Sequence, residues 1–148
     1  MRKIAAVLAA GAVCTLTVAA LSSAASTKTV WTAALTSRQE VPKQVVKAPL
    51  AHGLFKGTLS GSTLTWKLTY AKLTGSATAA HIHLAAKGKS GNVLVPLCGT
   101  TPKCKSGLTG KATLTSALMS DFTKHLLYVN VHTAKNPAGE IRGQLARG

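Results

Sequence analysis

The sequence predicts an all-β domain, organised as an antiparallel β-sandwich or small barrel of about seven or eight strands with one short helix. Apolar and polar residues alternate along several short segments, which is the pattern of strands that have one face on a core. Gly, Pro, Asn and Ser break these segments at short intervals, as turns between strands do. The connections are too short for the crossovers that join parallel strands, so the sheet is expected to be mainly antiparallel.

The alternation is clearest between residues 63 and 73. Leu64, Trp66 and Leu68 fall on one face of this segment, whereas Thr65 and Lys67 fall on the other. The first face is expected to lie on the core and the second in solvent. The complete set of expected strands covers residues 29–35, 51–59, 63–73, 77–84, 92–97, 108–114, 126–132 and 140–145.

One helix is expected, at residues 116–124. Leu114, Leu118 and Phe122 recur at four-residue spacing, and the hydroxyl of Thr115 can cap the start of the helix. Residues 36–50 form the longest stretch without a regular pattern, and they are expected to be a connection packed over the sheet.

The first 25 residues are expected to be a secretory signal peptide. Arg2 and Lys3 precede an uncharged apolar run, and Ser23 and Ala25 are suitably small for cleavage before Ser26. The run is shorter than the roughly 20 residues that span a bilayer. We therefore expect one domain at residues 26–148 with a secreted or periplasmic destination and no transmembrane segment after cleavage. A retained N-terminal anchor is the alternative.

The chain is strongly basic, with 18 Lys and Arg against three Asp and Glu and a net charge of +15. Such a field attracts anionic polymers and surfaces. Lys87, Lys89, Lys103 and Lys105 flank two loops that we expect at one end of the domain. They are the predicted binding surface for an anionic envelope polymer or another extracellular macromolecule. A solvated surface without a partner is the alternative, and no specific nucleic-acid motif is present.

Two cysteines, Cys98 and Cys104, remain once the signal peptide is removed. An even number of cysteines in an exported chain favours a disulfide, which here would close a short loop. The alternative is a redox or metal role, but the spacing is not that of a Cys-x-x-Cys pair.

Three histidines are candidate metal ligands. His81 and His83 lie two residues apart and so share one face of a strand, while His132 lies on a second predicted strand. If the two strands are neighbours, three imidazoles converge in a set that suits zinc or copper. Glu140 is expected to act as a fourth ligand or as a partner that fixes an imidazole tautomer. A purely structural polar network is the alternative.

Three stretches of the chain resemble the chordin-type (CHRD) family. They are residues 35–42 with Gln-Glu-Val-Pro at their end, residues 80–83 with Ala-His-Ile-His, and residues 127–145. The last stretch, with Asn-Val-His-Thr and Asn-Pro-Ala-Gly-Glu-Ile-Arg-Gly-Gln-Leu, is the most specific. The resemblance implies an immunoglobulin-like all-β domain of exported proteins with no established enzymatic activity.

The predicted function is therefore that of a non-enzymatic structural or binding module of the cell exterior, and we expect a monomer. A copper- or zinc-binding protein is the alternative, and no other cofactor is expected. A metal-dependent hydrolase or lyase that uses the same histidines is a third hypothesis. Three carboxylates are few for a glycosidase-type acid pair, and neither a Gly-x-Ser-x-Gly elbow nor a phosphate-cradling glycine loop is present. His52 and His125 are expected on the surface or in loops.

Overall fold

The computed structural model describes residues 27–42 and 48–148, so the expected signal peptide and its cleavage site lie outside the described residues. The described chain is mostly strand with one α-helix, which confirms the all-β prediction. The strands are β1 (Lys28–Thr36), β2 (His52–Ser60), β3 (Thr63–Ala71), β4 (Ala77–Leu84), β5 (Val93–Cys98), β6 (Leu108–Thr113), β7 (Leu127–Thr133), β8 (Ile141–Gln144) and β9 (Ala146–Arg147), and the helix is α1 (Ser116–Thr123).

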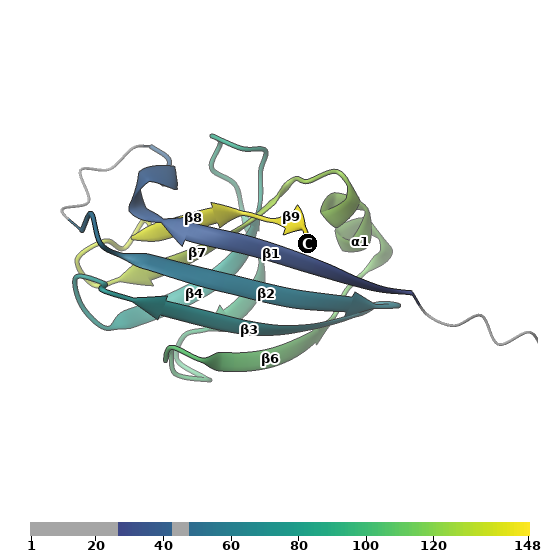
Figure 1. Ribbon diagram of the computed structural model, residues 1–148, viewed down its shortest axis with the longest axis horizontal. Helices are drawn as coiled ribbons and strands as arrows, with labels where there is room; N and C mark the ends of the chain where they lie inside the picture. Colours follow the sequence, from purple (N-terminus) through teal and green to yellow (C-terminus); the bar gives the residue numbers. More distant parts are fainter. Residues whose placement is uncertain (1–26, 43–47) are drawn as a thin grey trace, which may run out of the picture.

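The strands form one continuous sheet in the order β5-β4-β7-β8-β1-β2-β3-β6, and β9 pairs with β1. Every pair of named strands is antiparallel. The sheet curls into a nearly closed barrel, with β5 and β6 at its two edges (Figure 1). Of the two predicted architectures, the small barrel is therefore the one that the chain adopts.

The core fills the inside of this curled sheet, and the period-two pattern decides which side chains enter it. Phe55, Leu64, Leu68 and Ile82 are fully buried there. Each alternates with residues that point away from the core, as Thr65 and Lys67 do on β3. The predicted orientation of β3 is thus confirmed.

The helix α1 packs beside one end of the barrel (Figure 1). Its first turn is capped by the hydroxyl of Thr115, which accepts a hydrogen bond from the backbone N–H of Leu118. Phe122 is its buried residue and contacts the ring of Trp31 edge to face, with 5.2 Å between the ring centroids. The four-residue spacing therefore predicted both the helix and the face that it buries.

The predicted last strand is divided into two. Leu145 lies between β8 and β9, is buried in the core, and donates its backbone N–H to Leu127. After this residue the chain leaves β7 and pairs with β1 instead, with Trp31 opposite Arg147. Residues 37–39, in the stretch expected to be irregular, form a short 3-10 helix.

The expected disulfide joins Cys98, at the end of β5, to Cys104 in the connection to β6. The backbone N–H of Gly99 also donates to the carbonyl of Pro102 within this loop. Among residues 27–42 and 48–148, no helix is both long and apolar enough to cross a membrane.

Candidate functional site

The strands that carry the three histidines, β4 and β7, are direct neighbours in the sheet. Their register places Ala79 opposite His132 and His83 opposite Tyr128. Directly opposed residues share one face of a sheet, so His81, His83 and His132 all lie on the face that points away from the core. The two histidine-bearing strands are thus neighbours, which is what convergence of the three imidazoles requires.

We call this surface of β4, β7 and β8 the histidine face. Register pairs across the three strands place four further polar side chains on it beside the histidines. Its members are His81, His83, Tyr128, Asn130, His132, Arg142 and Gln144. The segment before residue 43 and the loop between β4 and β5 partly cover this face, and the hydroxyl of Ser90 joins them by donating to the carbonyl of Val41.

The three imidazoles are close enough to share one ion. One ring nitrogen from each of His81, His83 and His132 lies within 4.8 Å of the other two. Nδ1 of His81 is 3.2 Å from Nε2 of His132. Two nitrogens that bind one tetrahedral zinc ion at ordinary bond lengths are about 3.3 Å apart. The histidine pair therefore already has the spacing of two metal ligands.

Backbone carbonyls fix the tautomers of two of these rings. Nδ1 of His83 donates to the carbonyl of Gly91 at 3.0 Å, and Nδ1 of His132 donates to the carbonyl of Pro137 at 3.0 Å. The lone pair of each ring is therefore on Nε2. Nε2 of His83 is buried and has no hydrogen-bond partner among the described residues. A buried acceptor without a hydrogen-bond partner lowers the stability of the fold, and its lone pair is available to a ligand.

Burial keeps all three rings neutral. Burial lowers the pKa of His132 to about 4, and the nearby His81 and His83 add a smaller lowering effect. The hydrogen bond to the Pro137 carbonyl opposes this shift, because it raises the pKa. Burial likewise lowers the pKa of His81, helped by nearby His83. Burial also lowers the pKa of His83, together with the charge of Arg142. Neutral imidazole is the form that binds a metal ion.

Tyr128 holds the imidazole of His83 from the neighbouring strand. The two rings are stacked, with 4.8 Å between their centroids and 9° between their planes. The guanidinium carbon of Arg142 lies 3.5 Å from the centroid of the Tyr128 ring. The phenol of Tyr128 also accepts a hydrogen bond from the backbone N–H of Gly91. These contacts fix the orientation of His83 from the side facing β8.

Glu140 does not join the histidines. It is fully buried, and its carboxylate accepts hydrogen bonds from Thr74, Thr133 and Asn136. Burial alone would raise the pKa of Glu140, but these hydrogen bonds outweigh it and hold the pKa below its ordinary value of 4.5. Glu140 ties the turn between β7 and β8 to the connection after β3. The backbone carbonyls of Gly91 and Pro137 take the tautomer-fixing role that was expected of it.

The four candidate lysines are exposed, but they are not gathered at one end. Lys87 and Lys89 lie in the connection before β5, whereas Lys103 and Lys105 lie in the connection after it. Since β5 runs between them, the two pairs lie at opposite ends of this strand. The expectation of a single lysine-bearing end is therefore wrong. The placement of His52 and His125 on the surface is confirmed, because both are exposed.

Sequence reasoning missed a group of buried polar residues next to the histidines. Glu40, Asn130 and Arg142 are each less than 5% exposed, and Nδ2 of Asn130 donates to Oε2 of Glu40 at 3.3 Å. Alternation along β7 and β8 placed Asn130 and Arg142 on the face away from the core. The pattern does not show that residues 38–42 and the loop after β4 cover this face and bury them.

Comparison with known proteins identifies one family. The CHRD domain matches residues 31–145, a range that contains the whole histidine face and Glu40. No curated protein and no solved structure matches the chain. Because the match covers most of the chain, this protein is a member of the CHRD domain family.

Proposed function

We propose that this CHRD domain is an extracytoplasmic metal-binding module, which takes a copper or zinc ion through His81, His83 and His132. The observation that carries the proposal is the convergence of three neutral imidazoles, whose ligand nitrogens lie within 4.8 Å of one another. Nε2 of His83 adds to it, because this buried lone pair has no partner within the part of the chain that the structure describes.

The chemistry of the donor set suits these ions. Three histidines with one open position are a common arrangement for zinc and copper, and imidazole nitrogen is a preferred ligand of both. The carbonyls behind His83 and His132 hold their rings as outer-shell partners do in known metal sites. A fourth position would be open to water or to a donor from a partner.

The proposed role is binding and not catalysis, since the CHRD family is in general a non-catalytic module. A disulfide is typical of oxidising compartments, and the disulfide between Cys98 and Cys104 supports an extracellular-type environment. Together with the expected signal peptide, it supports a secreted or periplasmic location.

Metal titration of mutants tests the proposal. The oxidised chain from Ser26 onward, without an affinity tag, is stripped with a chelator and titrated with Cu²⁺ and Zn²⁺. We expect one equivalent to bind, and His83→Ala or His132→Ala to weaken binding by at least about 10- to 100-fold. His52→Ala and His125→Ala remove exposed imidazoles and are the matched controls. Equal affinity of His83→Ala and His125→Ala would overturn the proposal.

A second function, attraction of an anionic envelope polymer, is supported on a different surface from the one expected. Lys56 on β2 lies directly opposite Lys67 on β3, and Lys111 on β6 is nearby, opposite Thr65. We call these three exposed residues the lysine face. Like charges that face each other across strands are destabilising. None of the three acidic residues of the chain lies on β2, β3 or β6.

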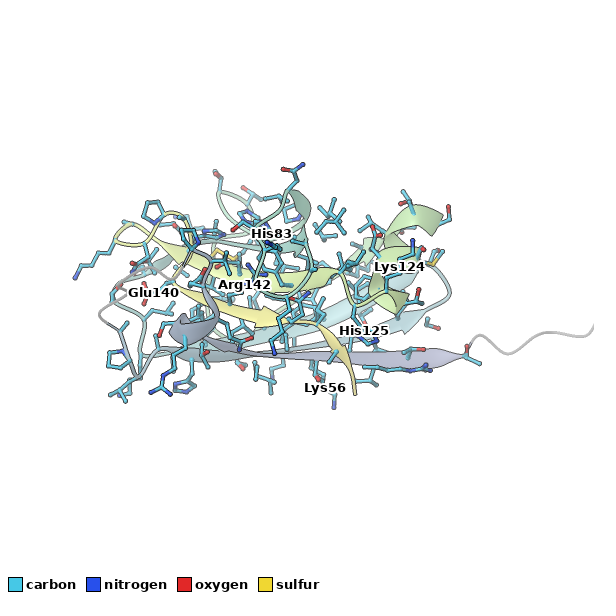
Figure 2. The ribbon with its side chains drawn as sticks, turned by 90° about the horizontal axis from the view of Figure 1, so that it is seen from above. Lys56, His83, Lys124, His125, Glu140 and Arg142 are labelled. Atoms are coloured by element: carbon cyan, nitrogen blue, oxygen red, sulfur yellow. A yellow bond between two sulfur atoms is a disulfide. The ribbon has the colours of Figure 1, made fainter. Side chains whose placement is uncertain are left out.

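The lysine face borders a shallow hollow of about 790 Å³, which Thr58, Thr65 and Thr69 also line. Lys56 lies on the opposite side of the molecule from His83 (Figure 2). Binding of dextran sulfate at several salt concentrations tests this function. We expect affinity to fall steeply with salt, and the double variant Lys56→Gln, Lys67→Gln to bind more weakly than Lys87→Gln, Lys89→Gln. Equal losses of affinity in both variants would show that binding depends on net charge and not on the lysine face.

A further inference from the structure

A second cavity opens over the β8 side of the histidine face, and none of the three histidines lines it. It has a volume of about 350 Å³ and lies between residues 38–41, the loop after β4, and β8. Its polar lining comes from Arg38, Gln39, Glu40, Lys87, Arg142 and Gln144. Three of these side chains are basic and one is acidic.

Arg142 forms a wall of this pocket and is unusual for a buried arginine. Its side chain is only 2% exposed, and its buried Nη2 has no hydrogen-bond partner among the residues that the structure describes. The guanidinium carbon lies over the face of the Tyr128 ring, 3.5 Å from its centroid. A guanidinium has five N–H donors, and a buried charge is normally paired and hydrogen-bonded. Arg142 thus has donor capacity that an anionic ligand can satisfy.

Glu40, the only acidic residue that lines the pocket, does not form an ion pair with Arg142. Glu40 is 3% exposed, and the structure records no ion pair between it and Arg142 among the described residues. Burial raises the pKa of Glu40 to about 7, against the opposing hydrogen bond from Asn130 and the charge of Arg142. Its carboxyl group is therefore protonated in a large fraction of molecules near neutral pH, and in that form it can donate a hydrogen bond through Oε1.

The remaining lining adds positive charge near the opening. Arg38 and Lys87 are both exposed, and they come from the two segments that flank the pocket. Gln144 fixes the base of the pocket by donating to the carbonyls of Ala85 and His125. The pocket is therefore net positive, partly enclosed, and anchored on a planar donor group.

We propose that this pocket binds a small ligand through a carboxylate or phosphate group, with the Arg142 guanidinium as its anchor and Arg38 and Lys87 at its opening. Guanidinium binds such planar or tetrahedral oxyanions through two parallel hydrogen bonds, which lysine cannot do. The ring of Tyr128 contacts both Arg142 and His83, so the ligand binds next to the histidines without using them as partners.

Titration of the chelator-stripped protein with inorganic phosphate, acetate and succinate, at constant ionic strength, tests this proposal. We expect saturable binding of one equivalent by at least one of them, and the tighter class distinguishes a phosphate ligand from a carboxylate ligand. Arg142→Lys keeps the charge but removes the planar fork, and it should weaken binding about tenfold. Lys124→Gln removes an exposed charge at the end of α1, outside the pocket lining, and should leave binding unchanged.

Changes at the pocket opening provide a second test, which does not depend on how well Arg142 variants fold. The double variant Arg38→Gln, Lys87→Gln alters only exposed side chains and should weaken binding several-fold. Absence of saturable binding by all three anions would overturn the proposal and leave Arg142 as a packing partner of Tyr128. Unchanged affinity in a folded Arg142→Lys variant would overturn it as well. Because metal is absent throughout, neither result bears on the histidine site.

Discussion

Nδ1 of His81 lies 3.2 Å from Nε2 of His132, although 51 residues separate the two histidines in the chain. The Nδ1 proton of His132 is engaged by the carbonyl of Pro137, so its Nε2 is the acceptor and His81 is the donor. In the metal-free protein this pair shares one proton. A metal ion that takes both nitrogens requires His81 to move this proton from Nδ1 to its own Nε2, which is a change of tautomer without net release of a proton.

Metal affinity should resist mild acid. Burial lowers the pKa of all three histidines, that of His132 to about 4. Protons therefore compete with the metal at a lower pH than they would at three ordinary histidines. We expect the Kd for Zn²⁺ to rise less between pH 7.5 and pH 6.0 than it would at such a site. A site of three ordinary histidines would lose more than about tenfold over the same range, and such a loss would contradict this account.

Replacement of Glu140 should destabilise the fold in a pH-dependent way. Hydrogen bonds from Thr74, Thr133 and Asn136 hold the pKa of Glu140 below 4.5, so its stabilising effect is present above that pH and is lost in more acid solution. Glu140→Gln leaves one acceptor oxygen for these donors and should cost about 3 kcal/mol at pH 7.

Urea unfolding at pH 7 and pH 3 measures this effect. The difference between the wild-type protein and Glu140→Gln should shrink at pH 3. Asp121→Asn, which changes the only acidic residue outside the buried networks, is the control. A difference that is equally large at both pH values would show that the charge of Glu140 is not what stabilises this turn.

Glu40 should have the opposite pH dependence. Burial raises its pKa to about 7, so its favourable contribution is present in acid and is lost as the pH rises from about 4.5 through 7. Glu40→Gln removes this ionisation. We expect the melting temperature of the variant, relative to the wild-type protein, to be higher at pH 8 than at pH 5. Thermal unfolding at the two pH values measures this difference in melting temperature. An equal difference at both pH values would contradict the raised pKa of Glu40.

Loss of the disulfide should have a moderate effect. The bond between Cys98 and Cys104 closes a loop with a sequence separation of six, and such a short loop contributes about 2 kcal/mol in the chain-entropy description. The double variant Cys98→Ala, Cys104→Ala should lower the urea midpoint accordingly and remain folded. Unfolding of the variant under native conditions would mean that the disulfide does more than restrain this loop.

Period-two alternation predicted most of the architecture. It predicted β3 and both histidine-bearing strands to within two residues, because an antiparallel strand over a core alternates strictly. The four-residue spacing up to Phe122 predicted α1 in the same way. Element order alone also places the two lysine-bearing loops at opposite ends of one strand, because Lys89 and Lys103 lie on either side of it. The expectation of a single lysine-bearing end overlooked this.

The neighbours of the histidines could not be predicted in this way. Pairing of β4 with β7 is a long-range contact, and local patterns do not report which distant strands pair. Arg142 and Glu40 are buried on the outer face only because loops cover it, and covering loops leave no periodic signal. The buried Nη2 of Arg142, which has no hydrogen-bond partner among the described residues, is therefore visible only in the folded chain.

The most direct test of the metal site is histidine-selective NMR of the chelator-stripped protein during titration with Zn²⁺. The account predicts that the Nε2 resonances of His83 and His132 shift at one equivalent, while their Nδ1–H protons stay bonded to Gly91 and Pro137. The resonances of His52 and His125 should remain in place. Shifts confined to these two exposed histidines, or no stoichiometric shift at all, would contradict the three-histidine site.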